Sequence, residues 1–225
     1  AAAAAYAQWL EQSRLGIIGG VMVVGIVNKE NRTRDLTPSA SAADRQGRLD
    51  PAATLQGGGA GRFLDFITGE LRQSVEAQLP DGMRILRRTL IGHSFGGLFT
   101  VNAVLTQPHA FDDFIAADPS FWWDQRRLIQ KAAADGLGDK AAAGPGRRLY
   151  LGFATKPRKD RTASAERPAA GARLSADPLV SDFIGKLESQ GMQVRRQDFP
   201  DEVHGTVMFP ALFDALKHFY TRELS

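Results

Sequence analysis

The sequence contains no cysteine among its 225 residues. Disulfide bonds, thiol nucleophiles and metal sites built on thiolates are therefore excluded. Because disulfides are the clearest mark of an oxidising compartment, their absence leaves the cellular compartment undetermined.

Long apolar runs are also lacking. The longest, residues 16–27, has 12 residues, whereas a membrane-spanning helix needs about 20. The five alanines at the start have neither the basic residues nor the apolar centre of a signal peptide. We therefore expect no membrane span. Residues 6–15 are compatible with a helix, but we assign no definite structure to residues 1–15.

An excess of one charge is absent as well. Lys and Arg together number 28 and Asp and Glu 25, which gives a net charge of +3, and the basic residues are scattered along the chain. We therefore expect no nucleic-acid partner. The length and the hydrophobic content of 43% suit one globular domain spanning residues 1–225.

Segments rich in β-branched and aromatic residues alternate with segments whose apolar residues recur every three to four positions. Strands separated by helices need crossover connections, so we predict an α/β protein with a mostly parallel sheet flanked by helices. Ligands bind beyond the carboxyl ends of the strands in such sheets. The predicted strands are residues 21–27, 84–91, 111–117, 148–154 and 193–199, and the predicted helices are residues 61–79, 98–105, 128–134, 179–187 and 209–220, with a long loop at residues 28–61.

The motif G-x-S-x-G lies between a predicted strand and a predicted helix, with Ser94 at its centre. In that setting it is typical of the nucleophile elbow of α/β-hydrolases, where a sharp turn lifts the serine hydroxyl clear of the sheet. We expect Gly92 and Gly96 to be required because a Cβ would collide across so tight a turn, and Gly97 to allow close packing of the helix. The motif also occurs by chance in glycine-rich connections, so the flanking strand and helix carry the interpretation.

A serine hydroxyl needs a neighbouring base, and histidine is the usual one near neutral pH. Of the four histidines, His204 lies in a loop after the last predicted strand, 110 residues beyond Ser94. Hydrolases of this class place nucleophile, acid and histidine in that chain order. We expect His93 to have a packing role, and His109 and His218 to lie away from the site.

Four ordered segments, residues 31–38, 92–98, 118–124 and 200–205, resemble the putative esterase (esterase D-like) family of α/β-hydrolases. The resemblance is closest to the branch of small bacterial hydrolases that includes the periplasmic siderophore (enterobactin and salmochelin) trilactone esterases. Members of the wider family cleave carboxylic esters without a metal or an organic cofactor, so none is expected. The resemblance leaves the bacterial periplasm and the cytoplasm open as compartments.

The resemblance implies Ser94 as nucleophile, His204 as base and the backbone N–H of Phe95 as one oxyanion donor. It also implies that Arg32 contacts an anionic or catechol-like part of the substrate. Trp122 and Trp123 follow a predicted strand, where aromatic side chains line a substrate pocket or belong to the core, and both interpretations stay open.

The sequence departs from the family pattern in two places. The family has further strands before the one matching residues 21–27, and a loop among them supplies the second oxyanion donor; here those strands are either absent or replaced by the alanine-rich start. The acid is the second departure, because the expected Asp or Glu after residues 148–154 is missing. We favour a Ser–His dyad, with Asp160 as the first alternative acid and Asp118 as the second.

The function predicted from the sequence is hydrolysis of a small-molecule carboxylic ester through an acyl-enzyme on Ser94, with a siderophore trilactone as the candidate substrate. Two alternatives remain at this stage. One is a binding protein that keeps the fold without catalysis, and the other is an acyltransferase of the same family. The protein is expected to be a monomer or a homodimer.

Overall fold

The structure is a computed structural model that describes residues 21–28, 30–44, 47–49, 52–137, 146–159, 166–167 and 175–221. The helix considered for residues 6–15 lies outside these ranges, and so does Asp160.

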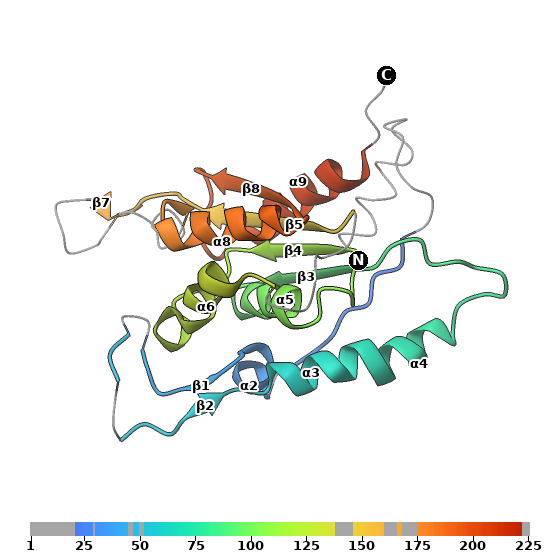
Figure 1. Ribbon diagram of the computed structural model, residues 1–225, viewed down its shortest axis with the longest axis horizontal. Coiled ribbons are helices and arrows are strands. Elements are labelled where there is room, and N and C mark those ends of the chain that lie inside the picture. The colour runs from blue at the N-terminus through green and yellow to red at the C-terminus, as the bar shows by residue number, and fades with distance from the viewer. Residues whose placement is uncertain are drawn as a thin grey trace.

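Four parallel strands form the central sheet, in the order β3-β4-β5-β8 (Figure 1). They are β3 (Thr89–His93), β4 (Asp113–Ala117), β5 (Arg148–Ala154) and β8 (Gln193–Phe199). The predicted α/β class and these four strands are confirmed, although β3 begins five residues and ends two residues later than expected, and β4 begins two residues later. Pairing is in register from the amino ends, with Thr89 opposite Asp113 and Asp113 opposite Arg148, so the carboxyl ends of the strands reach one edge together.

The helices fall close to the predicted positions. Residues 60–76 form one helical segment made of α3 (Ala60–Phe66), a π-helical turn (Ile67–Leu71) and α4 (Arg72–Glu76). The others are α5 (Phe95–Thr106), a 3₁₀ turn (Trp123–Arg126), α6 (Arg127–Asp135), α8 (Pro178–Ser189) and α9 (Met208–Tyr220). Within the described ranges, no helix has the length and apolar character needed to cross a membrane.

The predicted loop at residues 28–61 contains more structure than expected. It holds α2 (Arg32–Leu36) and an antiparallel pair of short strands, β1 (Ala40–Ser41) and β2 (Gln56–Gly57). A second short pair, β6 (Arg158–Lys159) and β7 (Glu166–Arg167), follows β5.

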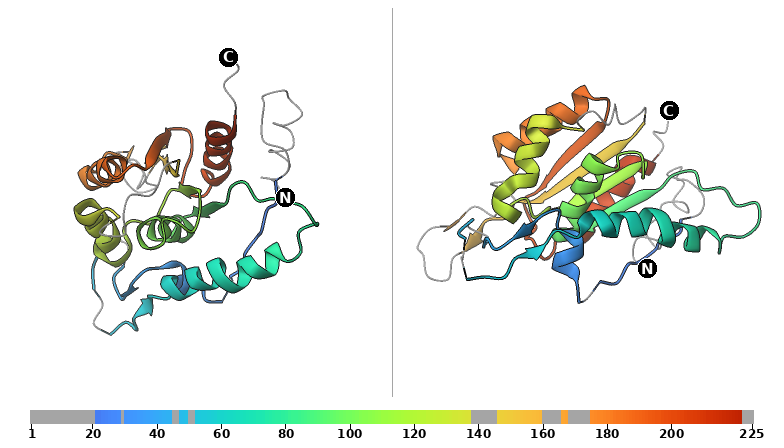
Figure 2. Two further views of the ribbon diagram at one scale, coloured as in Figure 1. Left: turned by 45° about the vertical axis from the view of Figure 1, so that its right-hand side comes forward. Right: turned by 60° about the horizontal axis from the view of Figure 1, so that its bottom comes forward.

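Helices cover both faces of the sheet (Figure 2). Alternate residues of a strand point to opposite faces, and two buried clusters reflect this. The helices α3, α5, α6 and α8 pack on the face that carries Phe114, Ala116 and Leu151. The opposite face carries Ile115 and Tyr150, and α9 covers it. The core therefore lies in two layers with the sheet between them.

Residues 21–27 were predicted to form a buried strand, and this prediction was wrong. The segment has no strand pairing, and its apolar side chains, from Val21 to Val27, are 41–80% exposed. A strand forms only as part of a hydrogen-bonded ladder, so β-branched residues alone do not create one. In the part of the chain that the structure describes, β3 is an edge strand and does not pair with this segment.

The turn between β3 and α5 has the strained backbone of a nucleophile elbow. Ser94 has φ 59° and ψ −119°, a conformation that non-glycine residues rarely adopt. A Cβ on Gly92 would lie 2.1 Å from the carbonyl oxygen of Gly96, and one on Gly97 would lie 3.0 Å from Pro119 Cα. Gly96 differs from the prediction, because a Cβ there would meet nothing within 4 Å. The backbone carbonyl of Gly96, and not its side-chain position, is what leaves no room for a Cβ on Gly92.

At the amino ends of the strands, a fully buried carboxylate joins several elements. Asp113 accepts hydrogen bonds from Arg148 Nε at 2.6 Å, Arg87 Nη2 at 2.8 Å and the Tyr220 hydroxyl at 2.5 Å. Burial alone would favour the neutral acid, but the bonds from Arg148, Arg87 and Tyr220 hold the pKa of Asp113 below its usual value. Burial and the neighbouring Asp113 raise the pKa of Tyr220 to about 12. This cluster links the segment before β3 to β4, β5 and α9 at the end of the sheet opposite Ser94.

We predict that Asp113→Asn destabilises the protein by about 3–5 kcal/mol, because two arginines lose their buried counter-charge. The ionised carboxylate stabilises the fold above its unfolded pKa of about 3.9, and that contribution is lost as the pH falls through the lower folded value. Denaturant unfolding from pH 3 to 7 measures both effects. Asp135→Asn is the matched control, since its pair with Lys131 is exposed. Equal stability of the two variants at pH 7 would contradict the prediction.

We also predict opposite effects of two alanine substitutions in the elbow. Gly92→Ala forces the backbone apart at Gly96 and lowers the melting temperature sharply. Gly96→Ala fills open space on a helix and leaves stability unchanged or raises it by up to about 1 kcal/mol. Thermal unfolding of the two variants beside the wild type makes the comparison, and similar losses in both would show that the turn is not constrained as described.

Candidate active site

Three side chains meet at the carboxyl edge of the sheet. Ser94 lies between β3 and α5, Asp118 directly follows β4, and His204 lies in the loop between β8 and α9. The Oγ of Ser94 is 3.1 Å from Nε2 of His204, and Nδ1 of His204 is 2.6 Å from Oδ2 of Asp118. The in-register strand ends bring together residues that are 86 and 110 positions apart in the sequence.

Asp118 has a conformation that aims its carboxylate at the histidine. It has φ 42°, and its side chain is 6% exposed. Its backbone N–H donates to the Gly152 carbonyl at 2.7 Å, and its Oδ1 accepts from the Ala154 N–H at 3.2 Å. The end of β5 therefore orients the carboxylate, while Oδ2 remains available to His204.

The expectation of a Ser–His dyad does not match this geometry, because His204 has a carboxylate partner. The partner is Asp118, the second alternative among the sequence-based acids. Asp160, the first alternative, lies outside the described residues.

The hydrogen bonds define how His204 is protonated. A carboxylate can only accept, so Nδ1 carries the hydrogen that is donated to Asp118. In the neutral imidazole Nε2 is then the acceptor, and it faces the Ser94 hydroxyl. The imidazole thus presents an acceptor nitrogen to Ser94, and its side chain is 45% exposed, so water reaches it.

The amino end of α5 begins directly after Ser94. Phe95 is the first residue of this helix, and no side chain caps the helix start. The first N–H groups of a helix have no acceptor within the helix and carry the positive end of its dipole. The Ser94 carbonyl is occupied by the N–H groups of Leu98 and Ser120, which fixes the peptide that precedes Phe95.

Two tryptophan rings and a guanidinium surround Phe95, the residue after Ser94. The Arg32 guanidinium lies 5.0 Å from the centre of its ring, and the rings of Trp122 and Trp123 lie 5.6 and 5.2 Å away. Trp123 is 7% exposed and donates its Nε1–H to the Ser39 carbonyl at 2.9 Å, so it belongs to the core. Trp122 is only partly buried, and Arg32, which lies over the same Phe95 ring, is exposed.

Two residues near Ser94 had no role predicted at the site. Ser120 is buried, its Oγ lies 3.3 Å from Ser94 Oγ, and it is the third residue of the Asp-Pro-Ser-Phe-Trp-Trp-Asp segment. His93 contacts the carbonyl of His204 through Nε2 at 2.7 Å. Burial, followed by the proximity of His204, lowers the pKa of His93. Both residues belong to motifs visible in the sequence, but residue types alone do not indicate the direction of these side chains.

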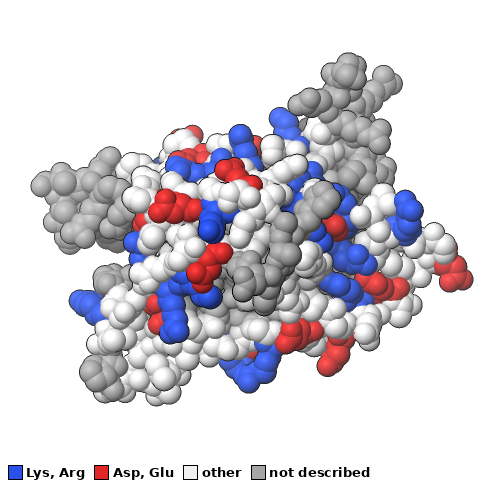
Figure 3. All heavy atoms as spheres, in the orientation of Figure 1, with Lys and Arg blue, Asp and Glu red and all other residues white. Residues whose placement is uncertain are grey.

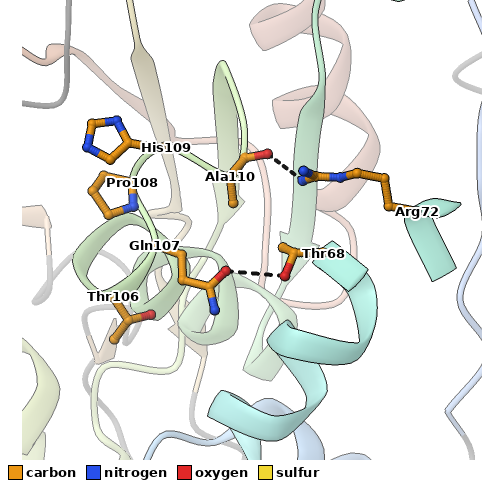
Figure 4. Close-up of a pocket in the computed structure, with 7 residues that line it drawn as sticks. All are labelled: Thr68, Arg72, Thr106, Gln107, Pro108, His109 and Ala110. Carbon is orange, nitrogen blue, oxygen red and sulfur yellow. Dashed lines mark hydrogen bonds between the residues drawn. The ribbon is translucent and has the colours of Figure 1, made fainter. Parts of the chain in front are cut away.

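A separate hollow of about 520 Å³ lies at the other end of α5 (Figure 4). Its polar groups already bond to one another: Arg72 Nη2 donates to the Ala110 carbonyl at 2.6 Å, and Thr68 Oγ1 donates to Gln107 Oε1 at 3.3 Å. Since α5 is about 18 Å long, this hollow is not part of the site at Ser94. His109, which lines it, lies away from the site as expected.

Acidic and basic side chains are interspersed on the face of the molecule shown in Figure 3. No large surface of one charge sign is visible on that face. Among the described residues, no group of three or more His, Cys, Asp or Glu side chains is arranged to hold a metal ion.

Comparison with known proteins gives consistent matches. The siderophore enterobactin esterase of Emericella nidulans is 32% identical over 206 residues, which cover 86% of this chain and 67% of that protein. The siderophore triacetylfusarinine C esterase of Aspergillus fumigatus is 33% identical over 136 residues, which cover 57% of this chain and 43% of that protein. Among solved structures, the siderophore hydrolase EstA from Aspergillus nidulans superposes with a TM-score of 0.69 at 27% identity, covering 96% of this chain and 77% of its own.

The chain thus spans about two thirds of the first relative and less than half of the second. The sheet and its flanking helices are those of an α/β-hydrolase, as the superposition with EstA shows. The family model described as putative esterase matches residues 3–178, which include the elbow and Asp118. The chain belongs to the putative esterase family.

Proposed function

We propose that this protein is a serine hydrolase that cleaves carboxylic ester bonds of a siderophore through an acyl-enzyme on Ser94. The observation that carries the proposal is the continuous hydrogen-bonded row from Asp118 through His204 to Ser94. The relatives support the substrate class, because their names specify esters of two different siderophores.

The first half of the reaction forms the acyl-enzyme. Nε2 of His204 takes the proton from the Ser94 hydroxyl as Oγ attacks the ester carbonyl. Asp118 accepts from Nδ1–H and stabilises the imidazolium that results. The N–H of Phe95, at the positive end of α5, donates to the oxyanion. The tetrahedral intermediate collapses, the imidazolium gives its proton to the leaving alcohol, and the acyl group stays on Ser94.

The second half releases the acid. Water reaches His204 because its side chain is 45% exposed. The imidazole removes a proton from that water, hydroxide attacks the acyl carbonyl, and Ser94 recovers its proton as the carboxylic acid leaves. This access supplies water as an acyl acceptor, and the relatives, which are named as esterases, favour hydrolysis over acyl transfer. A complete Ser–His–Asp row likewise favours catalysis over a binding-only role.

We assign the substrate contacts to Arg32 and Trp122, the exposed and the partly exposed neighbours of Phe95. Arg32 stacks on Phe95 next to Ser94 and presents a positive charge there. Trp122 packs on the same ring and is accessible in part. A guanidinium beside an aromatic surface fits an anionic catecholate siderophore. Trp123 has no place in this assignment because it is buried.

We predict that Ser94→Ala and Asp118→Asn each lower kcat for p-nitrophenyl acetate by about 10³- to 10⁴-fold. Asn tolerates the positive φ of position 118, so the second variant keeps the backbone while removing the charge. Initial rates of purified protein measure the effect. Asp201→Asn, in the same loop as His204, serves as the control with wild-type activity. An active Ser94→Ala variant would overturn the proposed function. An Asp118→Asn variant with wild-type kcat would show that Ser94 and His204 act as a dyad without Asp118.

We further predict that Arg32→Ala raises KM for enterobactin about 10-fold or more and leaves KM for neutral p-nitrophenyl acetate within about 2-fold. The reason is that Arg32 contacts the anionic part of the substrate rather than the reacting ester. Arg34→Ala is the matched control, because Arg34 belongs to the same helix but pairs with Asp35. Parallel changes with both substrates would contradict the assignment of Arg32.

A further inference from the structure

His93 is the last residue of β3 and precedes the nucleophile. Residues two apart on a strand share a face, so His93 lies on the face of Ile91, which packs in the cluster beneath α9. The loop that carries His204 leads directly into α9. The strand that delivers Ser94 thus also presents an imidazole to the loop that delivers its base.

The contact between the two histidines is directional. Nε2 of His93 lies 2.7 Å from the backbone carbonyl oxygen of His204, and the two ring centres are 4.6 Å apart at an angle of 37°. A carbonyl oxygen only accepts, so Nε2 of His93 must carry the hydrogen. This fixes the tautomer of His93: the neutral ring has hydrogen on Nε2 and none on Nδ1.

Other bonds hold the His204 loop to itself and to β8. Glu202 donates its N–H to the Phe199 carbonyl at 3.2 Å, and Val203 and Thr206 bond reciprocally through backbone and hydroxyl groups. These bonds shape the turn on either side of His204. The bond from His93 acts on the peptide of His204 itself and ties it to the strand of Ser94.

We infer that His93 is a positioning residue that holds the peptide of His204, and so keeps its imidazole aligned between Asp118 and Ser94, by donating a hydrogen bond from a neutral ring. This inference rests on the proposed function, since it concerns the base of that reaction. His93 contacts no substrate and transfers no proton in this role.

Charge explains why the neutral form is required. When His204 takes the proton of Ser94 it becomes a cation, and a protonated His93 at 4.6 Å between ring centres would oppose that step. The charged and titratable groups that act on His93 are His204 from the loop before α9, Asp118 from the end of β4 and Arg32 from α2. Burial, His204 and Arg32 favour the neutral ring, whereas Asp118 and the carbonyl bond favour the charged ring.

Two substitutions at His93 distinguish the effect of its hydrogen-bond donor from the effect of replacing its side chain. His93→Leu removes the hydrogen bond, and His93→Gln keeps an N–H₂ donor near the position of Nε2 but cannot titrate. We expect kcat for p-nitrophenyl acetate to fall about 10- to 100-fold in His93→Leu with KM unchanged within about 2-fold, and to recover to within about 3-fold of wild type in His93→Gln. We also expect the acidic limb of the pH–kcat profile to be less steep in His93→Gln, because one titrating group is gone.

His109→Leu is the control, since His109 is exposed at the far end of α5. Wild-type kcat in His93→Leu, or equal loss in His93→Gln and His93→Leu, overturns the inference and leaves the proposed function intact. Failure of the proposed function is distinct, because then wild type and Ser94→Ala react at the same rate. Nitrogen-15 NMR of the histidine rings decides the matter even if His93→Leu does not fold: hydrogen on Nε2 of His93 supports the inference, and hydrogen on Nδ1 overturns it.

Discussion

The site depends on one hydrogen bond, from Nδ1 of His204 to Oδ2 of Asp118 at 2.6 Å. It joins the loop after β8 to the end of β4, two elements that are not neighbours in the sheet. Without it, the imidazole would be free to turn and its tautomer would not be fixed. With it, Nε2 faces Ser94 as an acceptor, and the turn after β3 needs only to present the hydroxyl.

The candidate active site and the buried network around Asp113 lie at opposite ends of the same strands. Ser94 and Asp118 follow the carboxyl ends of β3 and β4, and both have positive φ values that cost free energy. Asp113, at the amino end of β4, joins Arg87, Arg148 and Tyr220 in a buried network. Since β4 is about 16 Å long, these interactions hold the strands together without occupying the site. The strained turns are tolerated because the sheet that carries them is fixed elsewhere.

Much of the fold could be predicted from the sequence where local pattern and burial agree. The bounds of β5 and β8 matched to the residue, because both segments have strand-forming residues and are bounded by turns. The helix at residues 60–76 was recognised from apolar residues every four positions, a spacing wider than the 3.6 of an α-helix. The π-helical turn at Ile67–Leu71 accommodates that drift and keeps Ile67 and Leu71 against the core. Residues 21–27 failed because strand formation depends on a partner, which local composition does not reveal.

The part of the site that lies within sequence motifs could be predicted. Ser94 and His204 follow from chain order and from the turns that hold them, whereas the acid depends on a side-chain direction. Asp118 points to His204 because its backbone has φ 42° and because β5 binds its other oxygen. Neither feature can be predicted from the residue types alone. The same holds for Trp123, whose indole N–H bonds the Ser39 carbonyl of a distant segment, and for His93.

The central claim is that Asp118, through His204, makes Ser94 a nucleophile. Reaction with a fluorophosphonate followed by peptide mass spectrometry tests it most directly, because it reports the reactivity of the serine without any substrate pocket. The account predicts a single adduct on Ser94 that forms rapidly in the wild type and at least about 100-fold more slowly in Asp118→Asn. An adduct on another residue, or equal rates in the two proteins, would contradict it.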